Sequence, residues 1–288
     1  MSKTFPTVGL IGSVPYAGMF ISPAQALGVE LLNLVDGAHD VLQADAKRCD
    51  VVTMIDKSIS SSIAKRLEAD GVAVRPSFSS LSSLRPSTAS GSESKLCVMV
   101  ARSPHGQATT WALSEIIRND DGWLMSITPA PAISESLQEK AQQLALDTSA
   151  QLGVVGVMAV EISIKDEIAT VVNVEMHPHD SGNWTVDGAV TSQYEQHLRA
   201  VLDLPLGDPA MTSPFVVTGN VYCGEKPNMY RPYLHLMART PAMKFHQYKS
   251  SVKAGELVGH VTLAGEDLHA IIEEVKHAQE YMQGVIDE

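Results

Sequence analysis

Short apolar runs alternate with amphipathic segments over the first 76 residues of the chain. The apolar runs predict four strands, at residues 7–11, 29–35, 49–54 and 72–74. The segments between them carry apolar side chains at helical spacing, which predicts helices at 19–27 and 58–69. Strands that alternate with helices form parallel sheets, so we predict a small N-terminal α/β domain over residues 1–76.

A different pattern follows residue 95, where apolar and β-branched runs predict antiparallel strands at 96–101, 109–117 and 122–128. Two longer runs flank a charged turn and predict a hairpin, at 154–164 and 168–174. Ser134 caps a predicted helix whose buried face contains Leu137, Ala141, Leu144 and Thr148. Further amphipathic helices are predicted at 190–201 and 268–285.

Residues 77–94 separate these two patterns and have an unusual composition, because nine of the eighteen are serine. A segment of this kind has no apolar periodicity to bury, and we predict a flexible linker. The chain is thereby divided into four parts. They are the N-terminal domain (1–76), the linker (77–94), a core (95–200) and a β-rich C-terminal cap with a terminal helix (201–288).

The net charge of the chain is −12 at pH 7, and its isoelectric point is about 5.2. Such a surface repels a nucleic-acid backbone and anionic lipid, so we expect neither nucleic acid nor membrane as a partner. The longest uncharged apolar run, 152–160, has about half the length that a membrane-spanning helix needs. The cysteines are odd in number and far apart, which indicates buried thiols in a reducing cytoplasm: Cys49, Cys97 and Cys223.

The segment from 156 to 191 contains the side chains best suited to chemistry. Glu161 lies on one predicted strand, and Asn173 and Glu175 lie on the next. Residues two apart on a strand share a face, so Asn173 and Glu175 can both face Glu161. Paired carboxylates at the end of a hairpin can hold Mg²⁺ against the phosphates of a nucleotide. Solvated strand ends and a polar turn are the alternative explanation of the same residues.

His177 and His179 follow, in the run His-Pro-His-Asp-Ser-Gly-Asn-Trp that ends at Trp184. Their spacing would place both imidazoles on one side of an extended segment, where Asp180 could complete a Zn²⁺ site. An isolated His-x-His pair is a weak zinc signal, and the sequence leaves this alternative open. The chain has no nucleophile-elbow, P-loop or zinc-protease motif.

A longer pattern extends through this run to Ala200, and its members are His179, Ser181, Gly182, Trp184, Thr185, Gly188, Thr191, Ser192, Gln193, Tyr194, Glu195, His197, Leu198, Arg199 and Ala200. In register, it resembles the signature of the carboxyaminoimidazole ribonucleotide synthases, ATP-grasp enzymes of de novo purine biosynthesis. Residues 204–207 and 259–263 match the same family. Weaker matches lie upstream at 98–103, 129–131 and 156–161, and in the N-terminal domain at 8–12, 49–53 and 72–77.

The resemblance implies a catalytic and Mg²⁺-binding site, and it also implies that parts of that site are missing here. It assigns vestigial catalytic positions to His179, Asp180 and His177. It assigns a vestigial Mg²⁺ site to Glu161 with Asn173, or with Glu175 after a slip of one residue. In the family a separate lid domain that holds ATP follows the strand ending near residue 77, whereas only the serine-rich linker stands here. We therefore expect Mg²⁺ and ATP to bind weakly or not at all.

The resemblance also implies a changed ribonucleotide site. The substrate positions it assigns are Ser181 and Lys249, and the family arginine seven residues beyond the lysine is Glu256 here. A glutamate in place of an arginine turns attraction for a phosphate into repulsion. The family's glycine-rich turn reads Gly-Ser-Val-Pro-Tyr at 12–16, and two acidic positions of the family are occupied by Ile55 and Lys57.

The predicted fold class is α/β, with a small N-terminal parallel-sheet domain of the pre-ATP-grasp, Rossmann-like type. A truncated ATP-grasp α+β core and a small β-rich cap follow it. We expect a catalytically impaired or inactive relative of the synthase that acts by protein association, as a homodimer or as a heterodimer with a full-length homologue. Two alternatives stay open. One is an active synthase that carboxylates aminoimidazole ribonucleotide with ATP and bicarbonate, and the other is a module that binds a purine intermediate without turnover.

Overall fold

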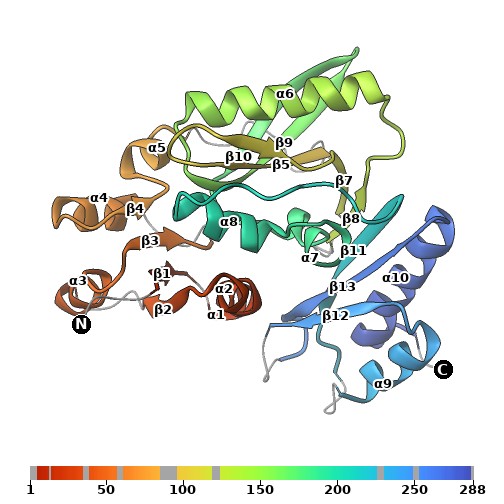
Figure 1. Cartoon of the computed structure of the whole chain (residues 1–288). Helices are drawn as coiled ribbons and strands as arrows, with labels where there is room; N and C mark the ends of the chain where they lie inside the picture. The colour runs from red at the N-terminus through yellow and green to blue at the C-terminus, as the bar shows by residue number, and fades with distance from the viewer. Residues whose placement is uncertain are drawn as a thin grey trace.

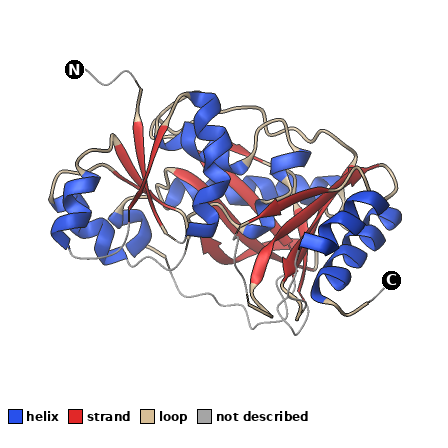
Figure 2. Ribbon diagram, turned by 90° about the horizontal axis from the view of Figure 1, so that it is seen from below, coloured by secondary structure: helices blue, strands red, loops and turns tan. Residues whose placement is uncertain are grey.

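Two β-sheets organise the chain, one small and parallel and one large and antiparallel (Figures 1 and 2). The structure is a computed structural model, and it describes residues 5–12, 14–34, 39–56, 61–84, 96–118, 124–225, 230–248 and 253–286. The small sheet lies at the N-terminal end, and the large sheet twists through the rest of the molecule with helices on both of its faces. This arrangement is the α/β class that the sequence predicted.

The small sheet has four parallel strands in the order β2-β1-β3-β4. Its strands are β1 (Thr7–Ile11), β2 (Glu30–Leu34), β3 (Val51–Met54) and β4 (Val74–Arg75). Its helices are α1 (Val14–Ala17), η1 (Gly18–Phe20), α2 (Ile21–Leu27), α3 (His39–Ala46) and α4 (Ser61–Ala69). Strand β1 is buried along its whole length because it packs against apolar side chains on both faces of the sheet.

The first part of the predicted linker is a helix, α5 (Phe78–Ser82). Ser77 caps it by accepting a hydrogen bond from the backbone N–H of Ser80. The Ser80 hydroxyl is buried and donates to the carbonyl of Gly153, at 3.0 Å. Serine therefore serves here as a helix cap and as a small buried hydrogen-bond donor. A serine-rich composition is also typical of flexible segments, so the sequence did not predict these roles. Residues 85–94 of the predicted linker lie outside the described residues.

The large sheet has nine antiparallel strands in the order β10-β9-β5-β7-β8-β11-β13-β12, with β6 paired to β5. The strands are β5 (Leu96–Arg102), β6 (Ala108–Thr110), β7 (Ser114–Arg118), β8 (Leu124–Thr128), β9 (Gly156–Lys165), β10 (Ile168–Glu175), β11 (Phe215–Tyr222), β12 (Lys244–Gln247) and β13 (Leu257–Gly265). The predicted hairpin is present as β9 and β10. β11 pairs with β8, so one sheet contains strands of both the predicted core (95–200) and the predicted cap (201–288).

The single strand predicted at 109–117 is two strands, β6 and β7. Trp111 lies between them and is completely buried, and its indole N–H donates to the carbonyl of Thr191 at 3.0 Å. The backbone N–H of Trp111 still donates to the carbonyl of Met99 on β5, and the break between β6 and β7 follows it. The partner of its indole is 80 positions away, so local periodicity could not reveal this contact.

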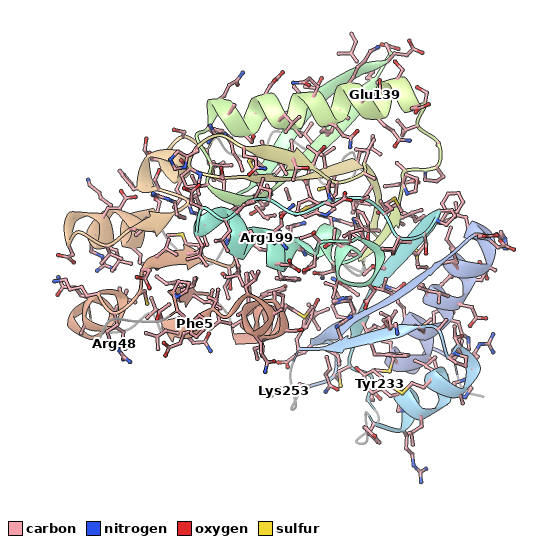
Figure 3. All side chains as sticks on the ribbon, in the orientation of Figure 1. Phe5, Arg48, Glu139, Arg199, Tyr233 and Lys253 are labelled. Carbon is pink, nitrogen blue, oxygen red and sulfur yellow. The ribbon has the colours of Figure 1, made fainter. Side chains whose placement is uncertain are left out.

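Helices cover the large sheet in two layers. Helix α6 (Glu135–Gln151) packs on one face of β5 and β9, and η2 (Asp180–Gly182), α7 (Thr185–Gly188) and α8 (Gln193–Val201) lie on the other. Figure 3 labels Glu139 on α6 and Arg199 on α8, which stand on opposite sides of these strands. The fully buried positions of α6 are Ala141, Ala145 and Ser149, so only Ala141 of the predicted face belongs to this group.

Helix α8 begins three residues later than the predicted helix at 190–201. Ser192 caps it through its side chain, and Val190 is 59% exposed outside the helix.

The C-terminal helices are α9 (Tyr230–Arg239) and α10 (Leu268–Gln283), and α10 packs on β11 and β13. In the part of the chain that the structure describes, no helix combines the length and apolar content that crossing a bilayer needs.

A single buried imidazole, that of His197 on α8, connects the two sheets. Its Nε2 lies 2.7 Å from the hydroxyl of Thr53 on β3, and its Nδ1 accepts from the backbone N–H of Val157 on β9 at 3.0 Å. Gly156 makes room for the ring, since its φ of 118° suits glycine and a Cβ there would lie 2.9 Å from the imidazole. Burial, with a smaller contribution from His177, lowers the pKa of His197 to about 3.

His197 should therefore make the stability of the fold dependent on pH. A pKa lowered from about 6.5 to about 3 means that the unfolded chain binds the proton more tightly, so the free energy of unfolding falls as the pH drops below 6.5. Between pH 7 and pH 5 this group should remove about 2 kcal/mol. Urea unfolding of the wild type and of His197→Gln at both pH values measures it, and the wild type should lose about 2 kcal/mol more than the variant. Equal losses would contradict the assignment.

Candidate functional site

The β9–β10 hairpin brings together the three residues predicted to bind a metal. Asn173 lies directly opposite Glu161 in the antiparallel register, and Glu175 lies opposite Ala159, two residues from Glu161. All three side chains thus share one face of the sheet, as the strand periodicity predicted. A register shift between Val171 and Asn173 marks a bulge at this point. Bulges re-aim side chains and are frequent next to sites.

Both carboxylates of this group have partners within the chain. Glu161 is 7% exposed, and its Oε1 accepts from Nη2 of Arg118, at the end of β7, at 2.9 Å. Glu175 Oε2 lies 3.1 Å from Nε2 of His177. The remaining member, Asn173, is a neutral amide.

The fit of these residues to a divalent cation is therefore poor. Mg²⁺ takes oxygen ligands and usually one or two carboxylates that no other cation neutralises. Here the buried carboxylate of Glu161 already faces a guanidinium. Within the described ranges, no group of three or more histidine, cysteine, aspartate or glutamate side chains is placed to hold a metal ion. We therefore derive no chemistry from a bound metal.

The geometry also disfavours the alternative zinc site. The rings of His177 and His179 have centroids 6.2 Å apart and are tilted by 44°. His177 Nδ1 lies 2.8 Å from the carbonyl of Pro178, and its Nε2 faces Glu175. Both nitrogens of His177 are therefore engaged by oxygen acceptors and are not directed at a shared cation with Asp180.

His179 is held in place by the turn that follows it. Its Nδ1 accepts from the backbone N–H of Ser181 and lies 2.7 Å from the Ser181 hydroxyl. Burial lowers the pKa of His179, although the charges of Asp180, Glu175 and Glu161 oppose the shift. Ser181 is completely buried, and its hydroxyl also lies 3.1 Å from Sγ of Cys97, whose pKa burial raises to about 12.

The substrate-binding role that the resemblance implied for Ser181 stays a prediction. Its hydroxyl has no exposed surface in this structure. The Ser181 hydroxyl contacts His179 on one side, which orients the imidazole, and the buried Cys97 thiol on the other. The other predicted substrate residue, Lys249, lies outside the described residues, as does Lys57.

Asp180 lies among tyrosines from both ends of the molecule. Its Oδ2 accepts from Nδ2 of Asn220 on β11 at 3.4 Å. Burial raises the pKa of Tyr16 on α1 and of Tyr248 after β12, and the negative charge of Asp180 adds to both shifts. The rings of these two tyrosines have centroids 5.6 Å apart. The contact between Tyr16 and Tyr248 therefore joins α1 to the segment after β12 beside the Asp180 carboxylate.

Two further positions at which this chain differs from the family it resembles, Ile55 and Glu256, contribute to packing and to a turn. Ile55 is 2% exposed and packs in the core shared by the small sheet and α8. Glu256 accepts through Oε2 from the backbone N–H of Lys253 at 3.2 Å and so stabilises the turn before β13. Of the three cysteines, all are free thiols, and Cys97 and Cys223 are buried whereas Cys49 is half-buried.

Sequence reasoning missed the role of Asn183, which lies in the run that ends at Trp184. The side chain is completely buried, and its Oδ1 accepts from the Tyr194 hydroxyl at 2.7 Å and from Gln193 Nε2 at 3.0 Å. Its Nδ2 donates to the Tyr248 hydroxyl at 2.9 Å. Only the structure shows these contacts, because Tyr248 is 65 positions away in the chain.

The class of protein follows from this fold and this strand pair. Residues 92–194 match the family model described as the ATP-grasp domain, and this range contains the β9–β10 hairpin and the His179 turn. The chain is a member of the ATP-grasp superfamily. Within that superfamily it is homologous to the N5-carboxyaminoimidazole ribonucleotide synthases of purine biosynthesis, which confirms the resemblance seen in the sequence.

Three relatives illustrate the similarity. The N5-carboxyaminoimidazole ribonucleotide synthase of Mycobacterium tuberculosis (strain H37Rv) is 41% identical over 192 residues, which cover 65% of this chain and 45% of that protein. The solved structure of the Thermus thermophilus synthetase has a TM-score of 0.80 at 22% identity, over 98% of this chain and 99% of that one. The Aspergillus clavatus synthase, solved with ADP and 5-aminoimidazole ribonucleotide, has a TM-score of 0.85 at 17% identity, over 96% and 98% of the two chains.

The match to the curated relatives is partial, since this chain spans about half of their length. The absence of a lid domain after residue 77 remains a prediction. The sites of the relatives therefore transfer to this chain only as proposals.

The hydrogen bonds of Asn183 should make it important for stability. In Asn183→Ala, the buried hydroxyl of Tyr194 loses its partner and the half-buried hydroxyl of Tyr248 keeps only His260, and we expect the free energy of unfolding to fall by about 3 kcal/mol. Asn33→Ala is the matched control, because Asn33 is exposed on β2 and its removal should change stability by less than about 0.5 kcal/mol. Urea unfolding measures both. A loss below about 1 kcal/mol in Asn183→Ala would show that the network is weak.

Proposed function

We propose that this chain is a catalytically impaired relative of the N5-carboxyaminoimidazole ribonucleotide synthases, and that it acts by protein association. The observation that carries the proposal is the neutralisation of Glu161 by Arg118 opposite the amide of Asn173. Transfer of a phosphoryl group needs positive charge that is fixed against its oxygens, and metal ions held by carboxylates commonly supply it. A strand pair that holds its own cation does not offer those ligands.

The short connection between α5 and β5 also supports the proposal. Water has to be excluded from a phosphoryl transfer, and the 13 residues between α5 and β5 are too few to form a covering domain. The His179 turn and α8, by contrast, are joined by hydrogen bonds from Gln193 to the backbone of His179, which preserve a folded surface.

An assay of phosphate release tests the impairment directly. With ATP, Mg²⁺, bicarbonate and 5-aminoimidazole ribonucleotide, we expect less than about 1% of the rate of an intact synthase run beside it, because the transition-state charge is not stabilised. Thermal unfolding in the same mixtures gives the second readout. A saturating ligand stabilises a protein of this size by several degrees, and we expect a shift below about 1 °C.

The outcomes of this experiment separate the possible functions. Turnover that depends on aminoimidazole ribonucleotide would identify a working synthase and contradict the proposal. A thermal shift of about 5 °C or more without turnover would identify a module that binds nucleotide or ribonucleotide. The proposal requires that turnover and a thermal shift are both absent.

An exposed apolar stripe on α9 supports association between two copies of this chain. Tyr230, Leu234 and Met237 are 70%, 55% and 49% exposed, and they follow one another at helical spacing. The adjoining face of α9 is buried through Tyr233 and Leu236. A stripe of this kind can pair with its own copy about a twofold axis, which buries the same residues on both subunits.

Sedimentation velocity tests this association. We expect the wild type to sediment as a dimer at micromolar concentration, and Leu234→Glu to sediment as a monomer because a carboxylate would be buried in the interface. Ile168→Glu is the matched control, since Ile168 is 66% exposed at the start of β10, outside the stripe, and the variant should remain dimeric. A monomeric wild type that also fails to co-sediment with a full-length homologue would contradict association.

A further inference from the structure

The contact between Arg118 and Glu161 crosses a strand. The order of the strands is β9-β5-β7, and within the described residues β7 pairs with β5 only at Ser114 and Glu115. Arg118 lies three residues beyond this pairing and reaches Glu161 on β9, a strand that is not its neighbour in the sheet. The β5 residue paired with Glu161 is Cys97, which is buried and uncharged in its thiol form. The guanidinium is therefore the cation that neutralises Glu161 within the described part of this face.

The burial of the pair is uneven. The Glu161 side chain is 9% exposed, whereas that of Arg118 is 48% exposed. A carboxylate this deeply buried is costly without a counter-charge, while the guanidinium keeps much of its contact with water. The carboxylate is thus the fixed part of the site, and the cation reaches it from the solvent side. A cation delivered from solvent could occupy the same position.

We infer that Arg118 is an internal substitute for a divalent cation at Glu161, and that it excludes a metal ion from the β9–β10 strand pair. Arg118 engages Oε1 of Glu161, and a second cation at the same carboxylate would be repelled by the guanidinium and so bind more weakly. Asn173 adds a neutral oxygen but no charge, so it cannot compensate for the guanidinium. The inference rests on the proposed function in that it treats this strand pair as no longer a working metal site.

Variants at Arg118 and Asn173 test the inference through Mn²⁺ binding, measured from the electron paramagnetic resonance signal of free Mn²⁺. The double variant Arg118→Met/Asn173→Glu presents two carboxylates without the guanidinium, and it should bind one Mn²⁺ at least about tenfold more tightly than the wild type. Asn173→Glu alone should stay close to the wild type, because Arg118 still occupies the site. Adding Glu161→Gln to the double variant should abolish the gain.

Three results would overturn the inference. The first is that the wild type binds Mn²⁺ and loses it in Glu161→Gln. The second is that Asn173→Glu alone binds as tightly as the double variant, which would mean that Arg118 does not compete. The third is a folded double variant that shows no gain. The phosphate-release assay stays separate, so turnover by the wild type would refute the proposed function while the Mn²⁺ comparison still decides the role of Arg118.

If the double variant does not fold, thermal unfolding of a single variant tests the same inference. Arg118→Met should unfold at a lower temperature than the wild type, by several degrees, and Mn²⁺ at millimolar concentration should restore part of the loss. Arg48→Met is the matched control, because Arg48 pairs with Asp45 on the surface of the N-terminal domain (Figure 3) and should respond to neither change. No loss in Arg118→Met, or a loss that Mn²⁺ leaves unchanged, would contradict the substitution.

Discussion

The burial of α8 between the two sheets is the constraint on which the rest of the structure depends. A helix that is covered on nearly all sides has to satisfy every polar side chain internally. His197 does so with Thr53 and Val157, one on each sheet. Gln196 exchanges two hydrogen bonds with the backbone of Gly207. The hydrogen bonds of His197, together with apolar contact, thereby hold the small sheet against the large one.

The same helix also fixes the turn that contains the candidate site. Gln193 accepts from the backbone N–H of His179 and donates to its carbonyl, both at 2.9 Å. The His179 turn is thus anchored to α8 by its backbone, independently of the charges that surround it. Side chains such as Arg118 and Asn173 can therefore alter the chemistry of this face without changing the turn, and a family-like scaffold can persist around a changed site.

Much of the fold could be predicted from the sequence, because the information was local. The strands of the small sheet and the β9–β10 hairpin follow from runs of apolar residues that each element carries itself. The indole contact of Trp111, the burial of Ser80 and the continuity of the sheet beyond residue 200 depend on partners far away in the chain. The site followed the same rule. Strand periodicity predicted the shared face of Glu161 and Asn173, but nothing in the pattern connected Glu161 to Arg118.

The Arg118–Glu161 pair also bears on what such a protein can do. Where a ligand supplies the counter-charge of a buried carboxylate, the stability of the fold rises and falls with the concentration of that ligand. Where a side chain supplies it, stability no longer depends on the ligand. Arg118 supplies a counter-charge to Glu161 from within the chain. If it does so in place of a ligand, as we infer, the fold lacks the coupling between metal binding and folding that a catalytic site can use.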